Sequence, residues 1–481
     1  MINKLQSFFL VGIFILSPFV LLAQEPDTGG VEDFSGMSTD DIPNINPQAM
    51  VADSINSFKA AFGITQIGGE TFVGTRLQPE VSLLKLGFGL DVPIQFNIND
   101  KSFRYEEFLG EDSVFKATDV LRMIRYFRYG KQKVDPFYIR LGDMTGVSLG
   151  FGTLVNNYTN SPSFENRKFG VNLDFNIKEV FGVEGIFSDV SGFNMLAIRP
   201  YVRPFRTTKV PILRTLEIGY GYVTDKGGSA ENAAYLTNGI QASNYDVGVT
   251  FLNTAFIKLI GYGQSSVIEK VKSDSLDQLF VTDGITYGKG EGTSFGLSSQ
   301  MKVAGNLFRF DTRIERLIYK DNYLPQFFDA MYEINKDEKI YSLGSATTSN
   351  GIYGSLGISI IDKIRFTGAL LLPDNISIET PALVRVQLET AELIENLTLS
   401  GSYIKGNLAD LSDAFILDDR SLANVNLSYD IASFLIIGAE YRWTFARTEM
   451  GTIEATDYFR PYFALNFPFG GGKNKDQDIG E

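Results

Sequence analysis

The chain has 481 residues and a formal net charge of −14, with 13% aromatic residues and neither cysteine nor histidine. Without these two residue types, thiol nucleophiles, Ser-His-Asp triads and the usual zinc and haem ligand sets are excluded. The acidic balance argues against nucleic acid as a partner, because nucleic-acid-binding surfaces carry a basic patch.

The first 23 residues predict an export signal. Lys4 supplies a short basic start, residues 5–22 are almost wholly apolar, and Ala23 precedes a polar stretch. This order is typical of a secretory signal peptide that is cleaved near Ala23. A membrane-anchoring helix is the alternative, because the apolar run approaches the length that spans a bilayer.

Residues 24–58 predict an acidic periplasmic leader. Up to Ser57 this segment carries only acidic charges, and Pro26, Pro43 and Pro47 interrupt regular structure. A chain with so little apolar surface to bury favours a mostly disordered, solvated state.

A long alternating segment at residues 84–98 is the strongest structural signal. Every even position is apolar, and the odd positions between them hold polar residues, glycine or proline. This period of two predicts a strand with one apolar and one polar face. The segment exceeds the about 9–11 residues that cross a bilayer, so part of it should project beyond the lipid. Gly87, Gly89 and Asp91 should face a lumen.

The same pattern recurs along the chain and predicts a single transmembrane antiparallel up-and-down β-barrel over residues 59–469. A soluble sandwich also alternates, but it seldom carries so much sustained aromatic content. From twenty candidate starts, some of them expected to be split or false, we predict an even number of about 16–20 strands, with about 18 favoured. The candidate starts lie near Ala60, Thr71, Leu84, Met123, Phe137, Lys168, Phe181, Phe193, Arg214, Tyr245, Phe256, Thr293, Leu307, Ile352, Ile364, Leu383, Leu397, Ala423, Phe434 and Tyr458.

Several candidate strands carry polar and charged residues on the face opposite their apolar side chains, which is the face that should line the lumen. These residues are Arg309, Asp311, Arg313, Glu315, Arg199, Tyr201, Arg203, Arg385, Glu389 and Arg140. One interpretation is a pore whose Arg and carboxylate wall creates a transverse field that selects solutes. The other is structural, with cross-strand ion pairs that hold neighbouring strands and fill a closed lumen. The sequence leaves both interpretations open.

Three arginines recur at a spacing of three, at positions 122, 125 and 128. On a strand this spacing would place arginine on both faces. It therefore favours a helix or a strand end outside the bilayer, with Arg125 above the membrane or reaching to its interface.

Three long connections are expected, at residues 145–162, 268–292 and 320–350. The third contains Pro325 followed by four large apolar residues at helical spacing, which predicts a short amphipathic helix over residues 325–333. This helix could cap or constrict the pore, or rest on the barrel rim. Its apolar residues are Phe327, Phe328, Met331 and Tyr332.

The last predicted strand carries a different signal. Residues 462–469 read YFALNFPF and place Phe463, Leu465, Phe467 and Phe469 on one face. This segment resembles the C-terminal signal strand that the barrel-assembly machinery of Gram-negative bacteria recognises, and the resemblance implies assembly by that machinery. The family usually ends on the aromatic residue, whereas here a hydrophilic tail follows at residues 470–481.

As a whole, the chain resembles porin-like outer-membrane β-barrel proteins of Gram-negative bacteria, outside any characterised family. The resemblance implies an outer-membrane location, contact with outer-membrane lipid, and a channel for small polar or anionic solutes with an Arg- and carboxylate-lined lumen. The alternative is a non-conducting barrel that acts as an assembly, secretion or partner-docking component. No spacing of carboxylates requires catalysis, so we expect no enzyme activity, no cofactor and no bound metal.

Overall fold

The computed structural model describes residues 57–67, 69–104, 117–162, 167–190, 194–225, 239–270, 288–305, 307–361, 363–447 and 453–468. The expected signal peptide (residues 1–23) and hydrophilic tail (residues 470–481) lie outside these ranges. So do Phe469 and the acidic leader up to residue 56.

Antiparallel strands make up most of the described chain. The strands are β1 (Ser57–Ile67), β2 (Glu70–Leu83), β3 (Leu86–Leu90), β4 (Val92–Asn97), β5 (Phe103–Arg104), β6 (Ile124–Tyr129), β7 (Phe137–Gly142), β8 (Gly170–Ile177), β9 (Phe181–Phe187), β10 (Met195–Val202), β11 (Glu217–Asp225), β12 (Ile240–Asn253), β13 (Ile257–Lys270), β14 (Gly290–Val303), β15 (Phe308–Tyr319), β16 (Ser349–Ile360), β17 (Ile364–Pro373), β18 (Ala382–Ile394), β19 (Leu397–Leu408), β20 (Ser421–Ala432), β21 (Leu435–Arg447) and β22 (Ile453–Pro468). The helices are α2 (Ala117–Met123), α3 (Lys336–Ser345) and the 3₁₀ turns η2 (Leu213–Thr215) and η3 (Leu411–Asp413). None of the helices in the described residues is long and apolar enough for a membrane crossing.

The strands form one sheet that closes on itself, because β1 pairs with both β2 and β22. β3 and β4 both pair with β2 and form a single barrel strand that is interrupted at Asp91. β5 pairs only with β4 and lies outside the ring. The ring therefore contains 20 strands rather than the 18 that the sequence favoured.

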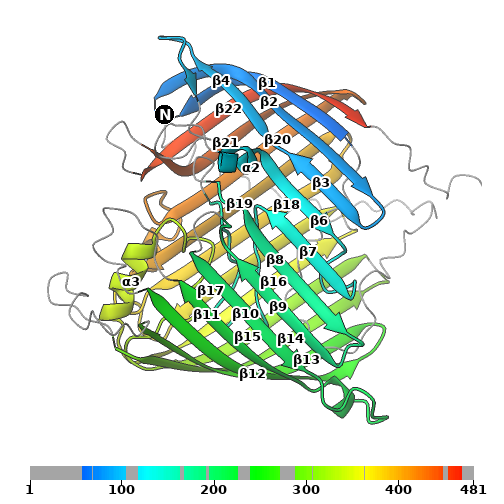
Figure 1. The fold of residues 1–481 in the computed structure, drawn as a ribbon, viewed down its shortest axis with the longest axis vertical. Coiled ribbons are helices and arrows are strands. Elements are labelled where there is room, and N and C mark those ends of the chain that lie inside the picture. Colours follow the sequence, from blue (N-terminus) through cyan, green and yellow to red (C-terminus); the bar gives the residue numbers. More distant parts are fainter. Residues whose placement is uncertain are drawn as a thin grey trace, which may run out of the picture. The chain divides into compact units, whose positions relative to one another are not determined.

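The predicted count was wrong because no candidate start was split or false. Each of the twenty starts lies inside a different barrel strand or within three residues of it. The barrel class itself is confirmed. The ribbon in Figure 1 shows the strands tilted together along one side of the barrel.

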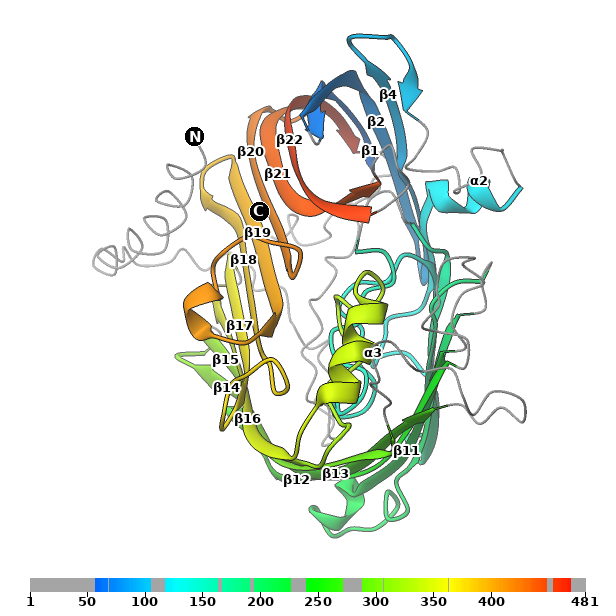
Figure 2. The ribbon, with the colours of Figure 1, turned by 90° about the vertical axis from the view of Figure 1, so that its left-hand side faces the viewer.

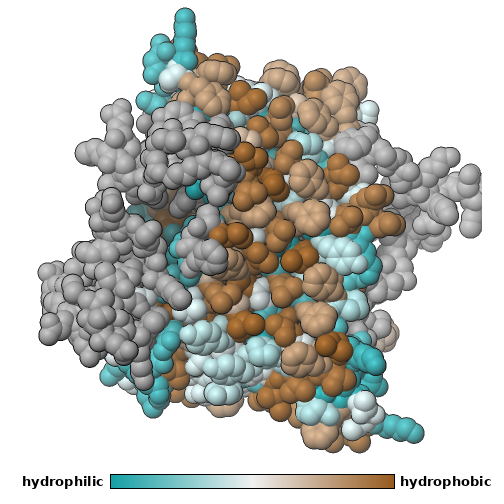
Figure 3. Space-filling model, viewed as in Figure 1, coloured by the Kyte–Doolittle hydropathy of each residue, from teal (hydrophilic) through white to brown (hydrophobic). Residues whose placement is uncertain are grey.

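The two faces of each strand meet opposite environments. In β10, Leu196 and Ile198 on the outer face are 44% and 41% exposed. Arg199, the next residue after Ile198, points to the inner face and is 1% exposed. Hydrophobic side chains cover a broad band of the barrel exterior in Figure 3. Apolar groups outside and polar groups inside are the arrangement expected for a barrel surrounded by lipid.

The long alternating segment behaves largely as predicted. Its even apolar residues from Leu86 onward point outward, and Gly87, Gly89 and Asp91 are buried on the inner face. It is not one continuous strand, because Asp91 breaks the ladder and its amide donates to the Met123 carbonyl at 2.8 Å. Leu84 lies in the preceding turn with a φ of 54°.

The two ends of the barrel differ in the length of their connections. At the end where β1 begins and β22 ends, all connections but one have two to seven residues. The opposite end carries the long connections, including residues 143–169 and 320–348. Short turns on one side and long loops on the other are typical of the periplasmic and extracellular ends of such barrels.

Parts of two long connections fold into the barrel and form its largest hydrophobic core. We call residues 143–162 and 320–348 the inserted loops. Their apolar side chains pack against inward residues of the wall such as Ile186, Met195 and Tyr353. In Figure 2, α3 of the second inserted loop lies within the outline of the ring of strands, and Figure 1 shows it at the end of the barrel that carries the long connections.

Candidate functional site

The predicted helix at residues 325–333 is absent, and the segment forms turns and a bridge instead. The helix in this connection is α3, which begins at Lys336. The backbone of Phe328 pairs with the other inserted loop, since its amide donates to the Leu154 carbonyl at 3.0 Å and its carbonyl accepts from the Asn156 amide at 3.2 Å. Bonds between loops thus replace the bonds within a helix that the apolar spacing predicted.

The four apolar residues assigned to that helix nevertheless lie inside the barrel. Phe327, Phe328, Met331 and Tyr332 are all buried, at 2% exposure or less. The rings of Phe328 and Tyr332 meet edge to face, with 4.8 Å between their centroids. Spacing identified the right side chains, but the backbone that presents them is irregular.

The two inserted loops are joined by further hydrogen bonds. The Gln326 amide donates to the Thr153 carbonyl at 2.9 Å. The Asn156 side-chain amide donates to the Gln326 side-chain oxygen at 2.8 Å. Backbone and side-chain bonds together make the loops one folded unit within the lumen.

A buried ionic cluster completes this junction around Glu333. The Glu333 carboxylate accepts a hydrogen bond from Tyr158 and pairs with Lys168. Lys336 lies 3.2 Å from Glu333 and 2.7 Å from Asp225 of β11. Although burial opposes ionisation, the two ammonium groups hold the pKa of Glu333 at about 2.

The first inserted loop is fastened directly to the barrel wall. Arg313 of β15 donates to the Phe151 carbonyl at 2.6 Å, and Glu184 of β9 accepts from the Gly150 amide at 2.7 Å. The Phe151 ring stacks on Tyr262 of β13 at a centroid distance of 4.9 Å. Both polar and aromatic contacts therefore hold the loop against the wall.

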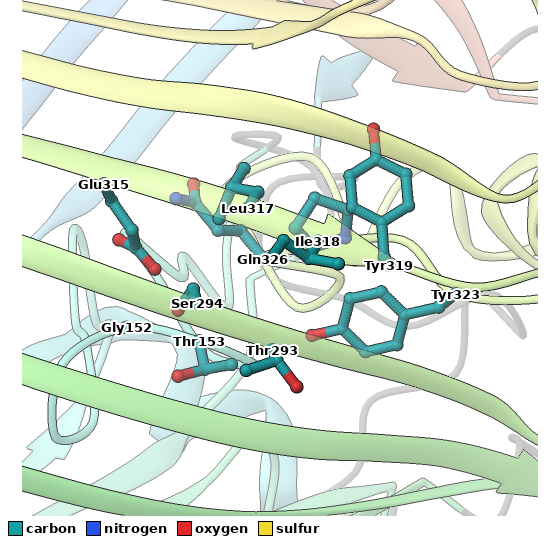
Figure 4. A pocket seen from close by; sticks show the side chains of 11 residues that line it. Gly152, Thr153, Thr293, Ser294, Glu315, Leu317, Ile318, Tyr319, Tyr323 and Gln326 are labelled. Carbon is teal, nitrogen blue, oxygen red and sulfur yellow. The ribbon is translucent and has the colours of Figure 1, made fainter.

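Little space remains between the inserted loops and the wall at β14 and β15. Figure 4 shows Glu315 and Ser294 from the wall near Thr153 and Gln326 from the loops. The cavity that they line has a volume of about 10 Å³, which is room for about one water molecule. This part of the lumen is filled by protein.

We call the side of the lumen from β9 to β15, against which the inserted loops pack, the filled half. Three predicted lumen residues on this side, Arg199, Tyr201 and Arg203, are buried. Arg199 Nε lies 2.9 Å from Asp246, and its terminal nitrogen lies 2.7 Å from Glu217. Arg203 pairs with the same Glu217 at 2.8 Å. Both guanidinium groups are buried. Carboxylates on the neighbouring strands β11 and β12 compensate their charges.

The predicted charge ladder on β15 is divided between two environments. Arg313 and Glu315 pair with each other and are buried beneath the inserted loops. Nearer the short-connection end, Arg309 is buried and Asp311 is half-buried. Arg140 of β7 is half-buried and donates to the carbonyl of Asp143 at 2.8 Å.

The wall formed by β17 to β20 is different, because its inward polar side chains remain in contact with solvent. Glu389 is exposed and Arg385 is half-buried, although both point inward on β18. The half-buried polar residues beside them are Arg365, Thr367, Ser400, Ser402, Asn424 and Asn426. Of the predicted residues, Arg385 and Glu389 thus belong to a wet surface within the barrel.

Two ionic groups lie near the seam of the barrel, where β22 pairs with β1, and the sequence analysis did not predict them as groups, although it expected Asp91 to face the lumen. Arg76 and Arg167 share Asp91, at 2.6 Å and 2.8 Å. Arg442 and Arg460 share Glu440, with Arg460 at 3.2 Å. The alternating pattern is consistent with inward positions for the strand residues of both groups. Arg167 lies in a connection, where no periodic pattern could have predicted it.

The arginines at a spacing of three lie at a helix–strand junction. Arg122 is in the last turn of α2, and β6 starts two residues later. A register shift between β3 and β6 lets Arg125 turn inward to Glu80 beside Tyr126, which also contacts Glu80. The expectation of a helix fits Arg122 alone, because Arg125 and Arg128 lie on β6. Arg125 does not reach out to the membrane interface as expected, and a β-bulge explains how it shares the inner face with Tyr126.

The closed sheet, the apolar exterior and the polar interior place the chain in the class of outer-membrane β-barrels. No protein-family model and no curated protein matches the sequence. Among solved structures, the carbohydrate-binding β-barrel Wzi of Escherichia coli is similar with a TM-score of 0.35 and 10% identity, over 87% of this chain and 85% of that one. OprD of Pseudomonas aeruginosa has a TM-score of 0.33 and 8% identity, over 86% and 94%.

A third similar structure is CdiB of Acinetobacter baumannii, with a TM-score of 0.27 and 7% identity over 85% of this chain. The matched region spans 60% of the length of CdiB. The assignment to a fold class therefore rests on the strand pairing of this chain itself.

Proposed function

We propose that this protein is a porin-like channel of the outer membrane that passes small polar or anionic solutes. The observation that carries the proposal is the wet inner wall of β17 to β20, where Glu389 is exposed and Arg385 is half-buried despite pointing inward. Side chains in a completely packed interior would be shielded from water, as Arg199 is.

The solute path runs along this wall and beside the inserted loops. Arg385 and Arg365 supply positive charge, and Glu389 lies across the strand pair from Arg365. Opposite charges along a narrow polar path create a local field that orients dipolar and charged solutes. The buried pairs of Arg199, Arg203 and Arg313 serve the barrel structure instead.

A preference for anions is supported by the ionic groups near the seam. There, the guanidinium groups of Arg76 and Arg167 share one carboxylate, Asp91. Arg442 and Arg460 likewise share Glu440. Four arginines thus gather on the inner side of the barrel in this region, and arginine along a channel wall favours anions.

The location and assembly of the barrel belong to the same proposal. The end with short connections faces the periplasm, and the inserted loops enter from the cell exterior. Phe463 and Phe467 are exposed on the outer face of β22, and Leu465 lies half-buried between them. This face is available to the barrel-assembly machinery before the strand closes against β1.

Conductance of the refolded protein in a planar bilayer tests the channel directly. Open-channel steps are expected, and Arg385→Ala should shift the reversal potential in a salt gradient toward cation selectivity. Arg316→Ala is the matched control, because Arg316 is exposed and pairs with Asp374 outside the lumen. A wild-type protein without steps at any voltage would contradict the proposal.

One observation favours the second candidate, a non-conducting barrel that docks an assembly or secretion partner. The inserted loops are packed like the interior of a soluble domain, with Tyr158, Phe328 and Tyr332 completely buried. If the loops close the whole lumen, neither steps nor solute-driven liposome swelling will be observed. Solute entry into liposomes would exclude this second function.

A further inference from the structure

The connection between β10 and β11, residues 203–216, is the exception at the short-connection end. It runs for 14 residues between Val202 and Glu217, where the other connections at this end have two to seven. Figures 1 and 2 show it as a green segment that extends beyond the strand ends near β12. Two to five residues are enough to join antiparallel neighbours, so the added length requires another explanation.

Hydrogen bonds to neighbouring elements hold this connection in a defined conformation. At its start, the Arg203 amide donates to the Val180 carbonyl at 2.7 Å. At its end, the buried hydroxyl of Thr215 accepts from the Thr250 amide of β12 at 2.9 Å. The connection therefore has a defined conformation, and we call residues 203–216 the platform.

The platform presents large apolar side chains to its surroundings. Phe205, Val210, Ile212 and Leu213 are 42%, 51%, 46% and 46% exposed. Exposed apolar residues on adjacent strand ends and turns extend the patch, namely Val180, Phe181, Phe251 and Leu252. A patch of this kind is unfavourable in water and marks a contact surface.

Its charges are all basic, although the chain as a whole has a net charge of −14. Arg203 is compensated by Glu217, and Arg206 by Glu179 in the neighbouring turn. Lys209 is exposed, and Arg214 is half-buried, next to Leu213. Apolar side chains interleaved with basic ones are the pattern of a segment that lies in a membrane interface.

We propose that residues 203–216 lie in the periplasmic interface of the outer membrane and bind anionic phospholipid head groups through Lys209. The patch is continuous with the lipid-facing surface, because the flanking residues Val202 and Ile218 are exposed on the outer face of β10 and β11. This continuity and the basic charge favour lipid over a periplasmic protein or a second copy. The inference rests on the proposed outer-membrane function.

Lipid retention by the full chain tests the recognition of head groups. The detergent-solubilised protein is titrated with phosphatidylglycerol or phosphatidylcholine, and bound lipid is counted by native mass spectrometry. Lys209→Glu should weaken phosphatidylglycerol binding by at least about fivefold, the effect of one basic residue at an anionic surface. Lys363→Glu is the matched control, because Lys363 is exposed in another connection at the same end.

Equal retention of the two lipids by the wild-type protein would overturn the proposal. So would an equal loss of binding in the Lys209→Glu and Lys363→Glu variants, because the effect would then reflect net charge alone.

Insertion is tested independently by fluorescence quenching in liposomes. The chain has one tryptophan, Trp443, so Phe205→Trp in a Trp443→Phe background provides a single reporter. Lipids brominated on the acyl chain should quench this reporter at least about twofold, as expected for a side chain at the head-group and acyl boundary. An unquenched reporter, or one shielded by dimerisation in detergent, would overturn the membrane assignment.

The outcomes separate this inference from the channel proposal. A barrel that binds phosphatidylglycerol through Lys209 but never conducts would refute the channel and leave the interface intact. A conducting barrel whose Phe205 reporter stays in water would do the reverse.

Discussion

The Tyr158 hydroxyl donates a hydrogen bond to the Glu333 carboxylate, 175 residues further along the chain, and so joins the two inserted loops. Lys168 and Lys336 pair with the same carboxylate. The packing of the inserted loops, which narrow the lumen, therefore depends on one buried acidic group.

Replacing Glu333 by Gln should loosen the inserted loops. The change leaves the ammonium groups of Lys168 and Lys336 without their shared counter-charge, and breaking a buried pair costs about 3–5 kcal/mol. Hydrogen exchange of residues 143–162 and 320–348 should rise while that of the barrel strands is unchanged. Tyr158→Phe, which removes one hydrogen bond to a charged group, should cost about 1.5–3 kcal/mol. Equal hydrogen exchange of the inserted loops in the wild-type protein and in both variants would show that the cluster does not hold the loops.

The inserted loops should be insensitive to pH in the neutral range and loosen only in strong acid. The pKa of Glu333 is about 2 in the folded protein and about 4.3 in an unfolded chain. A depressed pKa contributes stability that is fully present above about pH 4.3 and is lost as the pH falls toward about 2. Current noise of the reconstituted channel should increase over this window, and the increase should be absent in Glu333→Gln. A transition near neutral pH would assign control to another group.

Phe328→Ala should open the core of the inserted loops. Phe328 is completely buried, and truncating a buried phenylalanine costs about 3–5 kcal/mol. Under the proposed function, single-channel conductance should increase and the loops should become sensitive to protease. Phe295→Ala is the control, because Phe295 is exposed on the outer face. Unchanged conductance would place the solute path away from Phe328.

Arg199→Ala should destabilise the whole barrel. The variant leaves the carboxylates of Glu217 and Asp246 without their shared cation, at a cost of about 3–5 kcal/mol. Arg385→Ala, on the wet wall, should change stability by less than about 0.5 kcal/mol. The temperature at which the folded band disappears on unboiled gels measures both effects. Similar temperatures for the two variants would contradict the division of the lumen into a filled and a wet half.

Gly74→Ala should impair folding near the seam of the barrel. A Cβ atom at Gly74 would lie 1.9 Å from the Ile94 carbonyl oxygen, so the backbones of β2 and β4 would have to separate. At Gly406 in β19 a Cβ atom would meet nothing within 4 Å, which makes Gly406→Ala a matched control. The yield of heat-modifiable protein after refolding should fall only in the first variant.

Alternation in the sequence determined the faces of the strands because a strand has a strict period of two. The pattern identified all twenty strand starts, and it placed Arg199, Arg313 and Arg385 on the inner face. It could not separate the buried pairs from the wet wall, because all inward positions look alike along a strand. The number of strands was underestimated because starts were discounted without pairing information.

Sequence by itself therefore determined that the chain folds as a β-barrel with an apolar exterior and a polar interior. Only the tertiary structure decided what fills the lumen. Phe328 follows the helical spacing of its neighbours, yet its backbone pairs with Leu154 and Asn156. Contacts between segments so far apart in the chain depend on closure of the barrel around them, and no local period in the sequence encodes that closure.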